Sequence, residues 1–296
     1  PRNLAKYCMV PANAFKRHPV IEARIMELAA FAETFPYNRI EWRSTDLGII
    51  TGGVAYNYAR EVFPEASILK LGMVYPLPAK LIADFAAQVD KLIVLEELDP
   101  FIEDQVRLMG ISLYRPEEFR PQGTPYPQTK AVFPLVHELN PAVVRTDARA
   151  AGLLADSKDP EPIVQLADGL PPRPPVLCPG CPHRSTFYVL HKPGLPVNGD
   201  IGCYTLGMVQ PLDALHTVGC MGASVGVAHG AAVAGDKERH VAVIGDSTFF
   251  HTGIPALINI IYNHSNVITV IMDNRVTGMT GHQDNPGTGK TLQQKP

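Results

Sequence analysis

The stretch Val241-Ala-Val-Ile-Gly-Asp-Ser247 is a short run of apolar β-formers that ends directly in glycine, aspartate and serine. A second run, Val267-Ile-Thr-Val-Ile-Met272, ends in Asp273-Asn274, and 25 residues separate the two polar ends. Between the runs, residues 253–263 carry apolar side chains at helical spacing. The pattern predicts a strand, a helix and a second strand.

The two polar strand ends are expected to meet. Strands joined by a helical crossover lie parallel, so Asp246 and Asn274 emerge at the carboxyl edge of one sheet, where open α/β folds bind ligands. Their oxygens suit Mg²⁺, and the free N–H groups of the helix after Ser247 suit a diphosphate. Taken singly, Asp246 is as readily a helix N-cap and Asn274 a turn residue. Together, at this spacing, they predict a magnesium diphosphate site.

The composition is typical of a soluble globular protein. The 296 residues are 46% hydrophobic, which predicts about two domains of roughly 150 residues each. A net charge of −3 without a long basic run gives no reason to expect nucleic acid or a membrane surface as a partner. The apolar runs are too short for a membrane span and no signal segment opens the chain, so we expect a cytoplasmic protein.

The first part of the chain, residues 1–114, is expected to form an α/β domain. A helix with Pro19 near its first turn opens it. Three strand-helix units follow, with strands at 48–51, 67–71 and 91–95. This order predicts a small parallel sheet covered by helices.

A linker and a second domain are expected to follow. Twelve prolines fall within residues 115–175, a density that favours an extended interdomain connection over long helices. The second α/β domain takes residues 176–296. Its few strands would leave a face and an edge uncovered, so we expect it to continue past Pro296.

The five cysteines are a second lead to chemistry. An odd number, with two in a Cys-x-x-Cys, favours thiol or metal chemistry in a reducing compartment over a disulfide framework. Cys178 and Cys181 open the second domain, and Cys203 follows in a glycine-containing turn, a set suited to zinc or an iron–sulfur cluster. A redox dithiol and unconnected buried cysteines are the alternatives. Cys220 is a candidate fourth ligand, although its backbone, just before a glycine-rich helix, is an alternative reason for its position.

Two glycine-containing patterns point to phosphate or cofactor binding with different strength. Gly222, Gly226 and Gly230 recur every fourth residue, so one face of that helix admits either a flat cofactor or a closely packed backbone. The segment Gly289-Lys290-Thr291 resembles the end of a phosphate loop. Because Asp284 occupies the position of the leading glycine and no strand runs into it, we reject an ATPase.

Three histidines, His183, His251 and His282, lie near the expected cofactor edge. A neutral imidazole there can move a proton or hydrogen-bond a carboxylate, and each is equally a candidate for a structural donor.

Together these motifs resemble the thiamin-diphosphate-dependent 2-oxoacid:ferredoxin oxidoreductases, and among them the alpha subunits that act on indolepyruvate. The resemblance covers essentially the whole chain. It rests on Leu71-Gly-Met-Val-Tyr-Pro-Leu-Pro78, Leu95-Glu-Glu-Leu98, Leu177-Cys-Pro-Gly-Cys-Pro-His-Arg184, Gly199-Asp-Ile-Gly-Cys203, Gly219-Cys-Met-Gly222, Gly245-Asp-Ser247 and Asp273-Asn-Arg-Val-Thr-Gly278.

The resemblance implies a fold and a set of roles. It makes residues 1–114 a transketolase C-terminal-like domain and residues 176–296 a thiamin diphosphate-binding domain. The implied magnesium ligands are Asp246, Asn274 and the main-chain carbonyl of Val276. Cofactor contacts are implied for Gly219, Met221, Gly222, Gly245 and Ser247, where Ser247 replaces a glycine of the broader motif and keeps its backbone donor.

The same resemblance implies a [4Fe-4S] cluster held by Cys178, Cys181 and Cys203. The fourth ligand is then expected beyond Pro296, and the carboxylate that activates the cofactor before Pro1. Within the chain, His183 and His251 are the candidate catalytic residues.

The implied reaction is oxidative decarboxylation of an aryl 2-oxoacid to CO₂ and an acyl-coenzyme A, with electrons passed to ferredoxin and a second, beta subunit as partner. Two alternatives share the same clamp: a non-redox thiamin decarboxylase or synthase, and a non-catalytic cofactor-binding module of a larger complex. Electron delivery to ferredoxin separates the first alternative from the implied reaction.

Overall fold

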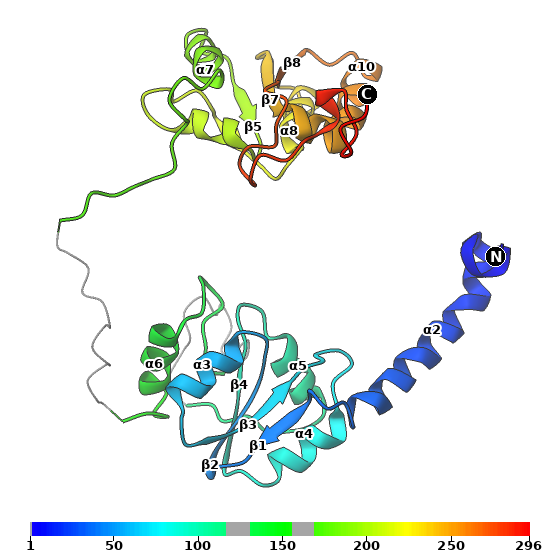
Figure 1. Ribbon diagram of the computed structural model, residues 1–296, viewed down its shortest axis with the longest axis vertical. Helices are drawn as coiled ribbons and strands as arrows, with labels where there is room; N and C mark the ends of the chain where they lie inside the picture. The colour runs from blue at the N-terminus through cyan, green and yellow to red at the C-terminus, as the bar shows by residue number, and fades with distance from the viewer. Residues whose placement is uncertain (1, 117–130, 156–168) are drawn as a thin grey trace. The chain divides into compact units, whose positions relative to one another are not determined.

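The computed structural model describes residues 2–116, 131–155 and 169–296. The chain forms two compact units, Pro1–Ile163 and Val164–Pro296, and each contains a four-stranded sheet (Figure 1). The predicted α/β fold with two mainly parallel sheets is confirmed.

The sheet of the first unit has the strand order β1-β3-β2-β4. Its strands are β1 Arg39–Glu41, β2 Ser44–Gly52, β3 Ala66–Leu71 and β4 Lys91–Leu95. As predicted, β3 and β4 run parallel to β2. The sequence did not predict β1, a three-residue strand that pairs antiparallel with β3 at the edge.

Helices cover both faces of this sheet, because successive strand residues point to opposite sides. On β2, Ile49 packs in the cluster that includes residues of α3 and α6, and Ile50 in the cluster that includes residues of α4 and α5. These helices are α3 Ala55–Val62, α4 Ala79–Ala86, α5 Phe101–Leu108 and α6 Pro141–Ala150.

The predicted linker at 115–175 is wrong for the residues that the structure describes in its middle. Phe133 is fully buried in the same cluster as Ile49, and helix α6 buries Val144 there as well. Pro141 does not oppose this helix because it stands at its start, after Asn140, whose side chain accepts hydrogen bonds from two backbone N–H groups of the first turn. The parts of the predicted linker at 117–130 and 156–168 lie outside the described residues.

The opening helix also differs from its prediction. Helix α2 runs over Pro11–Ala32, after the short α1 at Leu4–Tyr7, so Pro19 lies inside the helix and Pro11 begins it. Proline fits the first position of a helix, whose N–H has no partner in any case. Of the residues of α2, Ala32 is buried.

The sheet of the second unit is fully parallel and has the strand order β6-β5-β7-β8. Its strands are β5 Val197–Gly199, β6 Thr217–Val218, β7 His240–Gly245 and β8 Val267–Met272. The predicted strand, helix and strand correspond to β7, the helical segment that follows it, and β8, which pairs with β7 from His240 opposite Val267 to Gly245 opposite Met272.

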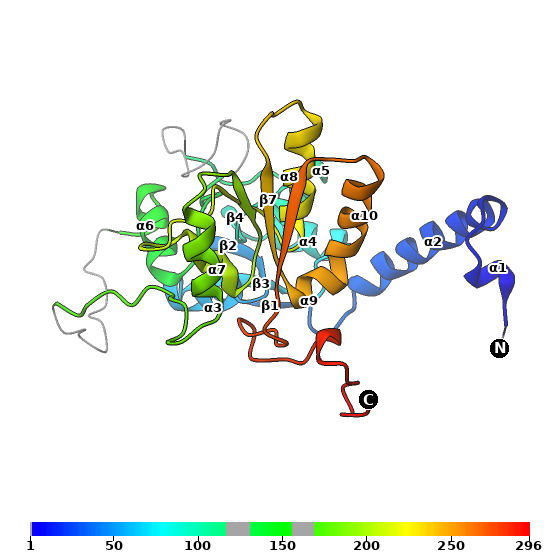
Figure 2. The ribbon, with the colours of Figure 1, turned by 90° about the horizontal axis from the view of Figure 1, so that it is seen from above.

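Helices lie on both sides of this sheet as well (Figure 2). Helix α7, His183–His191, packs Phe187 against Val197 and Val241, while α8, Ala223–Val233, packs against the opposite face. After β7 the chain enters α9, Asp246–Thr248, which continues through a π-helical turn into α10, Ile254–Tyr262. None of the helices in the described part of the chain has the length and apolar character that a membrane span requires.

Candidate cofactor site

The carboxyl ends of the four parallel strands of the second unit bring polar residues and glycines to one edge. Gly219 follows β6, Asp200 follows β5, Asp246 follows β7, and Asn274 lies two residues past the end of β8. Parallel strands place all four at the same edge of the sheet. The topology therefore produces the convergence that the sequence predicted for Asp246 and Asn274.

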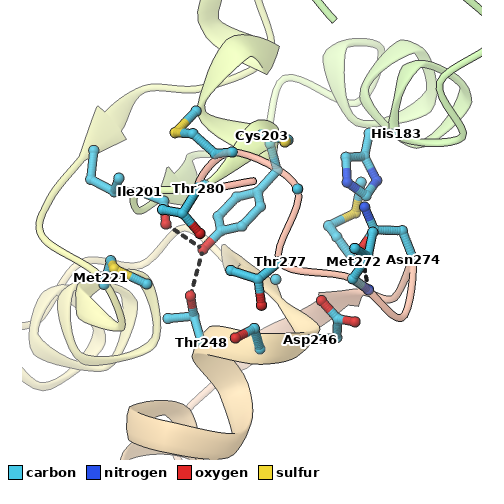
Figure 3. A pocket seen from close by; sticks show the side chains of 17 residues that line it. His183, Ile201, Cys203, Met221, Asp246, Thr248, Met272, Asn274, Thr277 and Thr280 are labelled. Carbon is cyan, nitrogen blue, oxygen red and sulfur yellow. Dashed lines mark hydrogen bonds between the residues drawn. The ribbon is translucent and has the colours of Figure 1, made fainter. Parts of the chain in front are cut away.

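A cavity lies at this edge (Figure 3). Eight of the predicted site residues line it: His183, Cys203, Met221, Gly245, Asp246, Ser247, Asn274 and Val276. The carboxylate of Asp246 points into the cavity, and Asn274 and His183 lie on the same side of it (Figure 3).

Five other predicted site residues are not among those that line this cavity: Gly219, Gly222, His251, Cys178 and Cys181. His251 is exposed within the π-helical turn after α9, so the structure gives it no place beside Asp246. Gly219 and Gly222 flank the cavity-lining Met221 in the loop before α8.

Asp246 is a buried carboxylate at the first position of α9 and is not the N-cap of that helix. Its side chain is 5% exposed, and its Oδ2 accepts a hydrogen bond from Asn285 Nδ2 at 3.1 Å. Gly245 takes the N-cap position of α9, where no side-chain capping hydrogen bond forms. A buried carboxylate needs an opposite charge or several hydrogen bonds to offset the loss of water. A cation in the cavity would supply that charge.

Asn274 keeps its role as a turn residue as well. Its Oδ1 accepts a hydrogen bond from Val276 N at 3.3 Å, which closes a tight turn directly after β8. An amide oxygen has two lone pairs, so this contact leaves one for a metal ion. Asp246, Asn274 and Val276 line the same cavity, and carboxylate, amide and carbonyl oxygens are the kinds of ligand that Mg²⁺ prefers.

Tyr204 explains why two of the loops at this edge contain glycine. A Cβ built on Gly202 would lie 2.3 Å from the Tyr204 ring, and one built on Gly245 would lie 2.4 Å from it. Any larger residue at Gly245 would therefore push the ring away or displace the start of α9. Burial, together with the hydrogen bond to Asp200, raises the pKa of the Tyr204 hydroxyl and keeps it protonated at neutral pH.

His183 is a neutral residue beside this edge. It begins α7, is 4% exposed and lines the cavity. Burial lowers its pKa, and the opposing charge of Asp246 raises it by less. An uncharged imidazole leaves the negative charge of Asp246 available to a cation.

Cys178 and Cys181 are close enough to Cys203 to affect its pKa. Burial raises the pKa of Cys203, and the charges of Cys181 and Cys178 raise it further. A Cβ on Gly278 would lie 3.2 Å from Cys203 Sγ, so the loop after β8 packs on this sulfur. Within the described residues, however, no three side chains of the His, Cys, Asp and Glu types are arranged to hold a metal ion. A magnesium site of one carboxylate, one amide and one carbonyl is a different kind of group.

Three residues at this edge were not assigned a role from the sequence. Asp200, fully buried, bonds to two loops; Tyr204 packs on Gly202 and Gly245; and Asn285 holds the carboxylate of Asp246. Asp200 follows a strand at the same edge as Asp246, and this is the one signal that could have identified it.

Comparison with known proteins gives the same cofactor. Residues 200–296 match the family described as thiamine pyrophosphate enzyme, C-terminal TPP binding domain; thiamine pyrophosphate is the same compound as thiamin diphosphate. Over 95% of its length the chain is 41% identical to the indolepyruvate oxidoreductase subunit IorA of Archaeoglobus fulgidus, and it covers 45% of that protein. The corresponding subunit of Thermococcus kodakarensis is 38% identical over 97% of this chain, which covers 47% of it.

The chain therefore spans about half the length of the curated relatives it matches. Among solved structures, a 2-oxoglutarate:ferredoxin oxidoreductase from Magnetococcus marinus matches 48% of this chain and 24% of its own, at 16% identity and a TM-score of 0.30, a likeness too slight to carry an argument. The sequence relationship extends over nearly the whole chain. Over nearly its whole length the chain is similar to indolepyruvate oxidoreductase IorA subunits, and its residues 200–296 match the thiamine pyrophosphate enzyme C-terminal domain.

Proposed function

We propose that this chain forms part of a thiamin-diphosphate-dependent enzyme that oxidatively decarboxylates an aryl 2-oxoacid of the indolepyruvate type to an acyl-coenzyme A and CO₂, with electrons passed to ferredoxin. The observation that carries the proposal is the convergence of Asp246 and Asn274 on one cavity, in a segment that matches a thiamine pyrophosphate-binding domain. The name shared by the relatives supports the substrate class. A beta subunit is the proposed partner, since those relatives are named as subunits.

Asp246, Asn274 and the Val276 carbonyl are proposed to hold Mg²⁺, with the diphosphate on the same ion. Asp246 contributes the one full negative charge of the set, and Asn285 fixes the rotation of its carboxylate. The backbone N–H groups of Ser247 and Thr248, at the start of α9, are the proposed donors to the phosphate oxygens, because both residues line the cavity. The loop after β8 supplies Asn274 and the run from Val276 to Thr280 to the cavity wall.

Thiamin diphosphate, when bound, would supply the nucleophilic carbon and the electron sink that decarboxylation of a 2-oxoacid requires. The chain's own part is to bind and orient. His183, neutral and buried at the cavity wall, is proposed to donate or accept a hydrogen bond at the reacting carboxylate or oxygen. His251 is exposed and stays a prediction without support from the geometry.

The first test is the metal site. In the full-length protein, Asp246→Asn keeps the shape of the side chain and removes its charge. We expect it to weaken magnesium-dependent binding of thiamin diphosphate, measured by titration calorimetry, by on the order of a hundredfold, as loss of a charged contact does.

The neighbouring acid provides a matched control. Asp273 is exposed, does not line the cavity, and accepts a hydrogen bond from Arg275 N at 3.0 Å that an asparagine can also accept. The affinity of Asp273→Asn for thiamin diphosphate should lie within about twofold of the wild-type value, a change too small to reflect a lost contact. Equal affinities for wild type and Asp246→Asn would remove the metal assignment and, with it, the proposed function.

Cys178, Cys181 and Cys203 are proposed to hold a [4Fe-4S] cluster, which would supply one-electron transfer towards ferredoxin. Support comes from the effect of Cys181 and Cys178 on the pKa of Cys203 and from the position of Cys203 on the cavity wall. Iron and sulfide analysis of the full-length protein, purified anaerobically, should find both elements, and Cys203→Ser should lower both. Stoichiometric zinc in place of iron would contradict the cluster and favour a structural zinc site.

A further inference from the structure

Asp200 is a buried carboxylate for which the proposed chemistry has no use. It is 0% exposed and directly follows β5, at the edge where Asp246 and Asn274 emerge. A charge without access to water must be stabilised by several hydrogen bonds. The two oxygens of Asp200 receive these bonds from two different loops.

Oδ2 of Asp200 holds the loop that precedes α8. It accepts hydrogen bonds from Gly222 N at 3.1 Å, from Ser224 Oγ at 2.8 Å and from Ser224 N at 3.4 Å. Gly222 has a φ of 87°, in the left-handed region, and a Cβ there would lie 2.2 Å from Thr252 Oγ1. The loop carrying Met221 is therefore fixed at its end by Asp200.

Oδ1 of Asp200 holds the loop that carries Cys203. It accepts a hydrogen bond from the hydroxyl of Tyr204, and the main-chain oxygen of Asp200 accepts another from Thr205 Oγ1 at 2.6 Å. The Tyr204 ring lies against Gly245, and its hydroxyl is 3.4 Å from Thr248 Oγ1. Tyr204 thus connects Asp200 to the start of α9, beside the proposed metal ligand.

Met221 and Cys203 line the same cavity (Figure 3). The loops that carry them are joined through the hydrogen bonds of Asp200. A carboxylate near the N-terminus of α8 would stabilise that helix in any protein. Helix capping alone, however, would not require Oδ1 of Asp200 to accept a hydrogen bond from the Tyr204 hydroxyl in another loop.

We propose that Asp200 is a positioning residue that fixes the Met221 loop relative to the Cys203 loop, and so sets the width of the cavity for the ring portion of thiamin diphosphate. This inference rests on the proposed function, because it takes thiamin diphosphate as the ligand. The diphosphate portion is held by other residues, those after β7 and β8. Loss of Asp200 should therefore weaken binding of the rings and leave binding of the diphosphate unchanged.

The test compares two ligands on the full-length protein at saturating Mg²⁺: thiamin diphosphate and inorganic pyrophosphate, each measured by titration calorimetry. In Asp200→Ala we expect thiamin diphosphate to bind about tenfold more weakly and pyrophosphate to bind within about twofold of wild type, since tenfold corresponds to the loss of one good hydrogen bond. Asp200→Asn should bind thiamin diphosphate nearly as tightly as wild type. Its amide oxygen can accept the hydrogen bonds from Gly222 and Ser224, and its NH₂ group can donate to the Tyr204 hydroxyl oxygen.

Ser224→Ala provides a milder variant, should Asp200→Ala fail to fold. It removes one bond to Asp200 and leaves the charge and the bond from Tyr204 in place. A few-fold loss for thiamin diphosphate with pyrophosphate unchanged supports the inference. Asp246→Asn, by contrast, should weaken the binding of both thiamin diphosphate and pyrophosphate.

Two results would overturn the inference while wild type binds both ligands: unchanged affinities in Ser224→Ala and in a folded Asp200 variant, or equal losses for the two ligands, which indicate general damage. A wild-type protein that binds neither ligand contradicts the proposed function itself. The two failures are therefore distinguishable.

Discussion

At the scale of single residues, the site contains the negative charge of Asp246, while the neighbouring His183 is uncharged. Asp246 is buried beside His183, and a charged imidazolium there would pair with the carboxylate and repel a metal ion. Burial lowers the pKa of His183 and so prevents this at neutral pH. The same burial makes the stability of the protein depend on pH in a direction that can be worked out.

Because the pKa of His183 in the folded state lies below its ordinary value of 6.5, the unfolded state binds more protons as the pH falls through 6.5. The stability contributed by a neutral His183 is complete above about pH 7 and is lost as the pH falls from about 6.5 towards the folded pKa. We expect His183→Gln to lose less free energy of unfolding than wild type between pH 7 and pH 5, measured by urea denaturation. His251→Gln, at an exposed histidine, is the control. Identical pH profiles for wild type and His183→Gln would contradict this account.

At the scale of elements, the sequence predicted what depends on local pattern. Strands β7 and β8 are runs of apolar β-formers, and a helical crossover makes them parallel, so the convergence of Asp246 and Asn274 followed without coordinates. Helix α6 also had a local signal, Asn140 followed by Pro141, but the prediction gave more weight to the number of prolines than to the position of one of them.

The contacts that complete the site depend instead on packing between distant segments. Asp200 bonds to Ser224, 24 residues away, and Asn285 bonds to Asp246, 39 residues away. No periodicity or spacing announces such pairs, because they depend on how loops fold over the sheet edge. The packing of the Tyr204 ring against residue 245 has only an indirect sign in the sequence. Position 245 is a glycine, because a side chain there would clash with the ring.

At the scale of the whole molecule, each of the two units has apolar clusters of its own. The sheet of the first unit packs with α3 and α6 on one face, and the sheet of the second with α7 on one face and α8 on the other. The residues of the proposed cofactor site all belong to the second unit. A ligand there and a core mutation in the first unit should therefore act on different parts of the chain.

Hydrogen exchange resolved by strand can measure both effects in the full-length protein. Thiamin diphosphate with Mg²⁺ at a hundred times its dissociation constant should raise the free energy of opening of β7 by about 2.7 kcal/mol and leave β2 unchanged. Val144→Ala, at a fully buried position of α6, should lower that of β2 by about 2 kcal/mol and leave β7 unchanged, because it opens a cavity in the first unit's core. Equal protection of both strands by the ligand would mean that the first unit contributes to the site. An unchanged β2 in Val144→Ala would mean that α6 does not belong to that core, and that the proline-rich segment is the connection its composition first suggested.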